Sequence, residues 1–160
     1  MEDSYSRRSV LTGAAIGVTG AVAGCLGGSG DGGATTPDVD TVANEPDYSG
    51  WFEDVENYDG TYDYTGRDEV TVAVGASGNG GNFAFAPAAI AVSTGTTVVW
   101  DWTGQAGPHN VVHRDGAFAS ERKSGDDAQF THEFTETGTY RYVCEPHVSF
   151  GMKGAVVVRE

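Results

Sequence analysis

The sequence predicts an all-β sandwich that follows an N-terminal segment without a core of its own. Between residues 70 and 158, apolar and polar residues alternate with the period of two that is typical of half-buried strands. No stretch of helical period lies between these strands, which excludes a parallel α/β sheet. Breaks that carry glycine or proline separate the strands, at residues 75–82, 87, 104–107, 116, 124–125 and 138.

The alternating stretches define the predicted strands. In the first of them, Val70, Val72 and Val74 alternate with Thr71 and Ala73. About 110 residues are enough for one hydrophobic core without disulfides, so a single domain is expected. That domain covers residues 48–160, and its other strands lie at residues 98–103, 130–134, 140–144 and 156–158.

A short amphipathic helix is expected in front of the strands, at residues 47–55. Trp51, Phe52 and Val55 stand at positions i, i+1 and i+4, behind possible caps at Asp47 and Ser49. The helix would pack these apolar side chains on the sheet. Trp51 is interpreted as a core residue.

Residues 1–24 are predicted to be an export signal. Arg7 and Arg8 lie in the run SRRSVL, which resembles a twin-arginine motif. The weakly apolar stretch 10–23 has the length of a signal h-region and is too short to span a bilayer. Its many glycines argue against the alternative of a buried core helix.

The run Val22-Ala23-Gly24-Cys25 resembles a lipobox, in which the cysteine is diacylated and becomes the new N-terminus. Two acyl chains give stable membrane anchoring, where a single chain is marginal. We therefore expect Cys25 to anchor the protein at the external face of the cell membrane, with a plain free cysteine as the alternative. Residues 25–47 are rich in Gly, Thr and Asp, which predicts a flexible acidic linker behind this lipid anchor.

The chain is strongly acidic. It has 23 Asp and Glu against 9 Lys and Arg, a formal net charge of −14 at pH 7. Clusters of basic residues are missing, so nucleic acid is excluded as an electrostatic partner, and so is an anionic membrane surface. The carboxylates are spread along the chain, which favours a generally solvated surface over a dedicated docking patch.

Four side chains in the C-terminal half suit a metal ion. Cys144, His147 and Met152 lie within nine residues, and His109 stands about thirty-five residues upstream. Two imidazoles, a thiolate and a weak thioether are the ligand set of a mononuclear electron-transfer copper site. The sulfur ligands suit Cu(I) and imidazole suits either oxidation state, so one fixed arrangement can serve both. These residues predict a copper electron carrier.

The spacing C-x2-H-x4-M resembles the ligand loop of plastocyanin, pseudoazurin and amicyanin. The resemblance extends to the flanking segments 138–144 and 108–112 and covers residues 70–159. As a whole, the chain resembles the plastocyanin-like blue copper proteins of halophilic archaea. The resemblance implies a cupredoxin Greek-key β-sandwich or barrel with one type 1 copper (Cu) per chain. It also implies a monomer whose transient partners are redox proteins of a membrane electron-transport chain.

The same resemblance assigns roles to residues around the ligands. An asparagine after the first histidine ties the two ligand segments together in that family, which implies this role for Asn110; a solvent-facing turn residue is the alternative. Val143 stands where plastocyanin has a tyrosine that offers a second electron route. Electron exchange is therefore expected through the exposed edge of His147, amid apolar surface for which Phe83, Phe85 and Pro87 are candidates.

Two other classes of metal site stay open. A zinc enzyme could use His109, Cys144 and His147 as ligands and Glu145 as base, although Met152 is a poor zinc ligand. A copper chaperone or storage module would favour exposed clusters of Met or Cys, which this chain lacks. The remaining histidines, His113 and His132, are interpreted as packing residues.

Overall fold

A computed structural model describes residues 38–160 of the chain. The predicted export signal, Cys25 and the greater part of the predicted linker lie outside the described residues. The residues that it describes all belong to one unit. Within this part of the chain, no helix has both the length and the apolar character that crossing a membrane requires.

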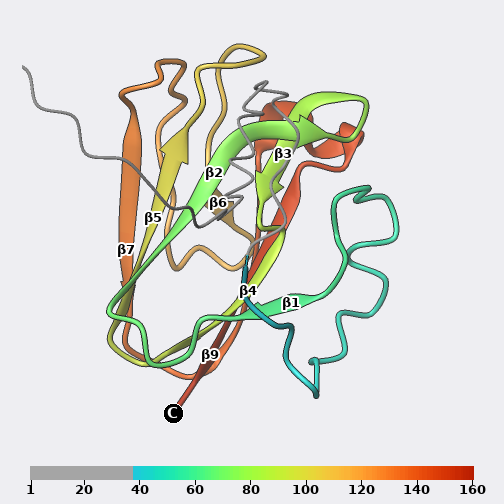
Figure 1. Cartoon of the computed structure of the whole chain (residues 1–160). Helices are drawn as coiled ribbons and strands as arrows, with labels where there is room; N and C mark the ends of the chain where they lie inside the picture. The colour runs from blue at the N-terminus through green and yellow to red at the C-terminus, as the bar shows by residue number, and fades with distance from the viewer. Residues whose placement is uncertain (1–37) are drawn as a thin grey trace, which may run out of the picture. The chain divides into compact units, whose positions relative to one another are not determined.

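The described residues form two β-sheets and one short 3-10 helix, so the all-β prediction is confirmed (Figure 1). The helix, η1 (Glu145–Phe150), connects β8 (Gly138–Val143) to β9 (Lys153–Arg159). One sheet has the order β1 (Thr61–Asp63), β4 (Ala89–Ser93), β9 (Lys153–Arg159), β8 (Gly138–Val143), β6 (Val112–His113). The other has the order β3 (Gly81–Ala86), β2 (Glu69–Gly78), β5 (Thr96–Trp102), β7 (Gln129–Phe134).

Strands that are distant in sequence lie side by side in both sheets. β2 pairs with β5 and β4 pairs with β9, both in parallel, while β8 pairs with β6 and β9 in antiparallel. Such crossovers between the sheets are what a Greek-key sandwich requires. They bring the segment before β6 and the segment after β8 to the same end of the molecule.

The main core lies between the two sheets. Val72 and Val74 of β2 are fully buried, as the alternation predicts, and so are Trp100 of β5 and Tyr142 of β8. The rings of Trp100 and Tyr142 meet edge to face with centroids 5.4 Å apart. Burying a valine side chain of this kind contributes roughly 1.5–3 kcal/mol. This core also contains Cys144, so the predicted ligand cysteine is part of the packed interior.

Three strands escape the sequence prediction. β4 is buried on both faces, so it shows no alternation. β1 has only three residues, too few for a period to appear, and β3 begins inside the break predicted at residues 75–82. β2 continues to Gly78 and passes through a register irregularity at Gly75, so the predicted break beginning at residue 75 is wrong.

The helix expected at residues 47–55 is not formed. The segment makes successive turns with i to i+3 hydrogen bonds, the first from Trp51 N–H to the Tyr48 carbonyl. Ser49 and Gly50 have positive φ values of 50° and 77°, which a right-handed helix cannot accommodate. The predicted packing is nevertheless confirmed, because Phe52 is buried and Trp51 is packed against the same cluster.

Residues 47–58, which we call the strap, cover the outer face of the five-stranded sheet. Phe52 and Val55 of the strap pack on Ala89 of β4 and Ala155 of β9 in a second hydrophobic core. This cover explains why β4 is buried on both faces. Residues 40–45, which fall within the predicted linker, also pack on this unit: Thr41 bridges to Tyr62, Val42 is buried, and the Asn44 carbonyl accepts a hydrogen bond from Arg159.

Candidate metal centre

Three of the four predicted ligands converge at one end of the sandwich. The distance from Cys144 Sγ to His109 Nδ1 is 3.6 Å, and that to His147 Nδ1 is 3.4 Å. The two Nδ1 atoms are 3.0 Å apart. In the part of the chain that the structure describes, these residues are the one cluster of His, Cys, Asp and Glu whose donor atoms all lie within 4.8 Å.

The triangle of donor atoms has the size that a bound metal needs. A point equidistant from the three atoms lies about 1.9 Å from each, close to the roughly 2.0–2.3 Å at which imidazole nitrogen and thiolate sulfur bind a metal ion. Two nitrogens and one sulfur in a trigonal array also match the donor chemistry of an electron-transfer copper site. The residues therefore fit a copper ion.

The strand register places the two ligand segments opposite each other. Val112 of β6 faces Val143 of β8 in an antiparallel pair, so extending this pairing by two residues sets Asn110 opposite Glu145. Asn110 Oδ1 accepts a hydrogen bond from the Glu145 N–H at 2.8 Å, and its Nδ2 donates to the Glu145 carboxylate at 2.8 Å. The side chain of Asn110 thus ties the His109 segment to the Cys144 segment.

The loop from Cys144 to Met152 is closed by its own backbone. The Cys144 N–H donates to the Met152 carbonyl, and the Met152 N–H donates to the His147 carbonyl. Pro146 lies in the first turn of η1, and Gly151 ends the helix in the left-handed conformation, with φ of 92°. Met152 is fully buried in the same core as Cys144. The backbone of the fourth predicted ligand therefore lies beside the backbone of Cys144.

His109 is oriented from behind by residues that the sequence did not indicate. Its Nε2 lies 2.9 Å from the carbonyl oxygen of Gln105, which can only accept, so Nε2 carries the proton and Nδ1 presents a lone pair to the centre. Gly75 lies against this bond, since a Cβ there would come 3.0 Å from Nε2. A lone glycine inside a strand signals a close backbone approach, so Gly75 could have been found from sequence.

Burial dominates the electrostatics of the centre. It raises the pKa of the Cys144 thiol, although the N–H groups of Asn110 and His147 and the charge of Arg122 oppose the rise. Burial also lowers the pKa of His109 and of His147, and Arg122 adds to the effect on His147. At neutral pH, the metal-free centre therefore holds a protonated thiol and two neutral imidazoles.

This protonation state predicts the stoichiometry of proton release. Copper uptake at pH 7 is expected to release about one proton per ion, because only the thiol of Cys144 must lose a proton to bind. Below the lowered pKa values of His109 and His147 the imidazoles are charged, so the number released rises as the pH falls. Titration of metal-free protein with copper in weak buffer measures the number of protons released per ion. Release of two or more protons at pH 7 would show that the imidazoles are charged there.

The other two histidines pack against an aromatic ring. His113 stacks on Phe118 with ring centroids 5.1 Å apart, and the ring centroid of His132 lies 4.8 Å from that of Phe118, so both are packing residues.

The predicted apolar patch differs at Phe85. Phe85 was expected on the surface near the ligands, but it is fully buried between the sheets, because it points inward from β3. The exposed aromatic residue at this end is Phe150, which is 54% exposed.

Comparison with known proteins identifies the family of the chain. Residues 70–159 match the family described as copper binding proteins, plastocyanin/azurin family. Halocyanin of Natronomonas pharaonis is 44% identical over 165 residues, which cover 99% of each chain. Plastocyanin of Scenedesmus fuscus is 35% identical over 57% of this chain and 100% of its own. The solved oxidised plastocyanin of Dryopteris crassirhizoma is 31% identical, with a TM-score of 0.48, over 56% of this chain and 100% of its own. The chain belongs to the plastocyanin/azurin family of copper binding proteins.

Proposed function

We propose that the protein is a blue copper electron carrier whose single type 1 copper ion is held by His109, Cys144, His147 and Met152. The observation that carries the proposal is the convergence of two imidazole nitrogens and one sulfur within 4.8 Å. Bound copper supplies a one-electron couple between Cu(I) and Cu(II). The chain's function is electron transfer to and from redox partners, and not catalysis.

The protein's contribution is to hold the ligands in place before and after the electron moves. His109 is fixed by Gln105, and Asn110 joins the two ligand segments. Cys144 and Met152 are fully buried, so water does not compete for the sulfur atoms. Ligands that are already in position need little reorganisation when the charge of the centre changes, which keeps the barrier to electron transfer low.

His147 is the ligand through which we expect electrons to pass. It is half-buried, whereas His109 is only 1% exposed. Its ring lies 4.7 Å from the ring of Phe83, which in turn stacks on the exposed Phe150 at 4.9 Å. A small apolar contact area of this kind suits a transient electron-transfer partner. Val143, by contrast, offers no polar edge for a second route.

The two rival sites fit the geometry less well. In a zinc hydrolase Glu145 would be the base, but its carboxylate is exposed and accepts a hydrogen bond from Asn110. A copper chaperone would present its sulfur ligands for transfer, but Cys144 and Met152 are both buried. The buried mixed donor set favours a resident ion that exchanges electrons.

Addition of Cu(II) to metal-free protein tests the proposed function. One equivalent is expected to produce an intense visible band from thiolate-to-copper charge transfer, and the band should vanish on reduction and return on oxidation. Zinc competition is the control, because zinc gives no visible band. A colourless protein that retains zinc in the presence of copper would refute the proposal.

The axial role of Met152 has its own test. Met152→Leu is expected to keep the copper and the colour but to raise the reduction potential, because loss of electron donation from the axial thioether destabilises the more highly charged Cu(II) more than Cu(I). Each tenfold loss of preference for Cu(II) raises the potential by about 60 mV. Redox titration against the wild type measures the shift. An unchanged potential would show that the thioether does not interact with the metal.

We further propose that the carrier is tethered to the external face of the cell membrane by a diacylated Cys25 and acts as a monomer. The twin-arginine run, the apolar stretch and the lipobox-like sequence support the tether. Mass spectrometry of the mature N-terminus should find two acyl chains on Cys25, and Cys25→Ala should move the protein from the membrane to the soluble fraction. An unmodified N-terminus would rule the anchor out.

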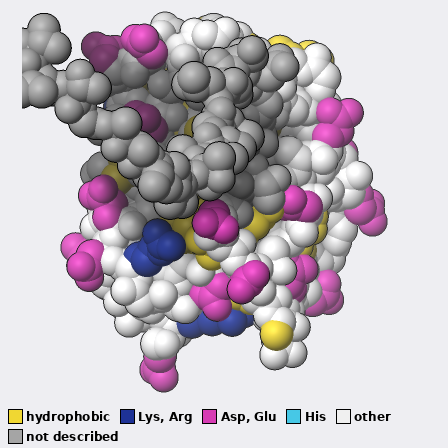
Figure 2. Space-filling view, viewed as in Figure 1, with side chains coloured by type: hydrophobic (Ala, Val, Ile, Leu, Met, Phe, Trp, Pro, Cys, Tyr) yellow, Lys and Arg dark blue, Asp and Glu magenta, His cyan; other side chains and the backbone are white. Residues whose placement is uncertain are grey.

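The surface charge bears on the choice of partner. Figure 2 shows acidic side chains distributed over the visible face, with few Lys and Arg among them. Within residues 38–160, the one ion pair joins Lys153 to Asp54, so most carboxylates face solvent without a cation. This distribution supports a solvated acidic surface, with the specific contact confined to the apolar end near His147.

A further inference from the structure

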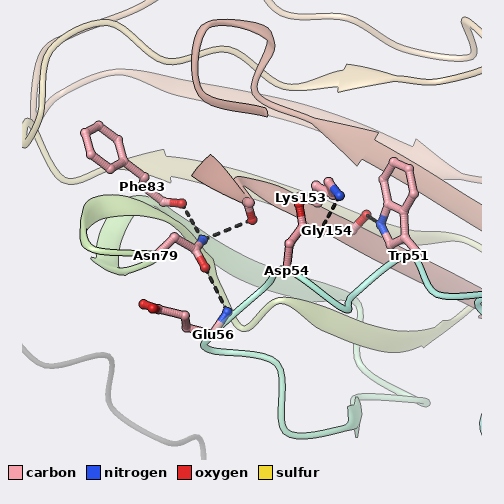
Figure 3. A network of polar contacts seen from close by, with 8 residues as sticks. Trp51, Asp54, Glu56, Asn79, Phe83, Lys153 and Gly154 are labelled. Carbon is pink, nitrogen blue, oxygen red and sulfur yellow. Dashed lines mark hydrogen bonds and ion pairs between the residues drawn. The ribbon is translucent and has the colours of Figure 1, made fainter. Parts of the chain in front are cut away.

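The strap contacts the ligand loop as well as the sheet (Figure 3). It lies outside residues 70–159, the part of the chain that matches the family. Asp54 forms an ion pair with Lys153, and Trp51 Nε1 donates a hydrogen bond to the Gly154 carbonyl at 3.2 Å. Both partners lie just after Met152 in the chain. The strap is therefore attached to the strand that begins directly after the thioether ligand.

Asn79 joins the strap to the ligand loop. Its Oδ1 accepts a hydrogen bond from the Glu56 N–H at 2.8 Å, and its Nδ2 donates to the Gly151 carbonyl at 3.0 Å and to the Phe83 carbonyl at 2.7 Å. The side chain is buried, and the residue has a φ of 56°, a conformation that Asn tolerates better than most residues. We call the Glu56, Asn79 and Gly151 groups the clamp.

The contact between the strap and Gly151 leaves no space. A Cβ on Gly151 would overlap the carbonyl oxygen of Asp54 and would lie 3.3 Å from Asn79 Oδ1. The backbone of the ligand loop is thus held on one side by the strap and on the other by its own hydrogen bonds, such as Met152 N–H to the His147 carbonyl. Movement of Gly151 would move Met152.

The side chain of Asn79 is also linked to His147, through Phe83. Phe83, whose carbonyl binds Asn79, places its ring 4.7 Å from the ring of His147. Asn79 therefore contacts the residue before the thioether ligand and the residue that covers the outer imidazole, although it touches neither ligand. Groups that orient ligands in this way change metal affinity by about 10- to 100-fold when they are removed.

We infer that Asn79 is a positioning residue through which the strap sets the position of Met152, and thereby the relative affinity of the centre for Cu(I) and Cu(II). The axial ligand tunes the potential of such centres. A looser Met152 would favour Cu(II) less, so weakening the clamp acts in the same direction as removing the thioether. The inference rests on the proposed copper centre.

The test is a double-mutant cycle between Asn79 and Met152. Asn79→Gly removes the side chain and permits the positive φ. It is expected to raise the ratio of Cu(I) to Cu(II) affinity by roughly tenfold and to change the electron paramagnetic resonance spectrum. In the Met152→Leu background the same change should have little effect, because the two act through one interaction. Equal shifts in both backgrounds would overturn the inference.

A control variant separates the clamp from general loosening. Asn82→Gly adds a glycine to the same β2–β3 hairpin but leaves the clamp intact, and it is expected to keep the wild-type spectrum and potential. If Asn82→Gly shifts the affinity ratio as much as Asn79→Gly, hairpin flexibility is the cause and the inference fails.

A measurement without copper keeps the inference testable on its own. Asn79→Asp keeps the shape and the acceptor for Glu56 N–H but cannot donate to the Gly151 and Phe83 carbonyls. Amide hydrogen exchange of Met152 in the metal-free protein is expected to be about tenfold faster in this variant, and unchanged exchange would overturn the inference. A wild type without a blue band would refute the proposed function instead.

Discussion

Replacement of Cys144 by serine is expected to abolish the blue colour and the redox activity while the sandwich stays folded. The visible band requires a thiolate, and a hydroxyl of high pKa is a poor ligand for Cu(I). The fold should survive because the Asn110 and His147 N–H groups that face the sulfur can donate to a hydroxyl oxygen instead.

Copper titration followed by visible spectroscopy measures this effect, with circular dichroism to confirm folding. Cys25→Ser is the matched control, because it removes the other cysteine of the chain and should leave the band unchanged. If Cys144→Ser retained a reversible blue centre, the assignment of the sulfur ligand would be wrong.

Replacement of Gly151 by alanine is expected to cost about 2–5 kcal/mol of unfolding free energy. The left-handed backbone accounts for roughly 1–2 kcal/mol, and the overlap of the new methyl group with the Asp54 carbonyl for roughly 1–3 kcal/mol. Because Met152 is the next residue, copper affinity should fall as well. Denaturant unfolding of the metal-free protein gives the free energy.

Gly80→Ala provides the control for this prediction. Gly80 also has a positive φ, of 77°, but a Cβ there meets no atom within 4 Å. This variant should therefore lose only the contribution of backbone strain, roughly 1–2 kcal/mol. Equal losses in the two variants would show that the contact between Gly151 and the strap does not stabilise the loop.

The sequence predicted the parts of the fold that have one buried face. The alternation of Val70, Val72 and Val74 appears because this part of β2 packs on the core on one side only. β4 was not predicted because the strap buries its other face, which removes the period. Local spacing could not show this, since the strap and β4 are more than thirty residues apart.

In the candidate site, the sequence predicted the metal ligands but not the residues that hold them in position. His109, Cys144 and His147 were indicated because their chemistry is rare and their spacing is informative, and the structure brings their donor atoms together. Gln105 was not indicated, because it acts through its backbone carbonyl, a group that every residue has. The role of Asn79 was not indicated either, since only the folded chain places its amide between the strap and Gly151.

The position of Thr41 sets where the proposed N-terminal tether joins the domain, relative to the metal centre. Thr41 bridges to Tyr62 of β1, the edge strand of the five-stranded sheet, while Cys144 follows β8, three places further across the sheet. Adjacent strands are about 4.8 Å apart, so β1 and β8 are separated by roughly 14 Å. The proposed lipid tether would join the domain at Thr41, away from His147. The imidazole of His147 would then stay accessible to a soluble partner and to a partner in the same membrane.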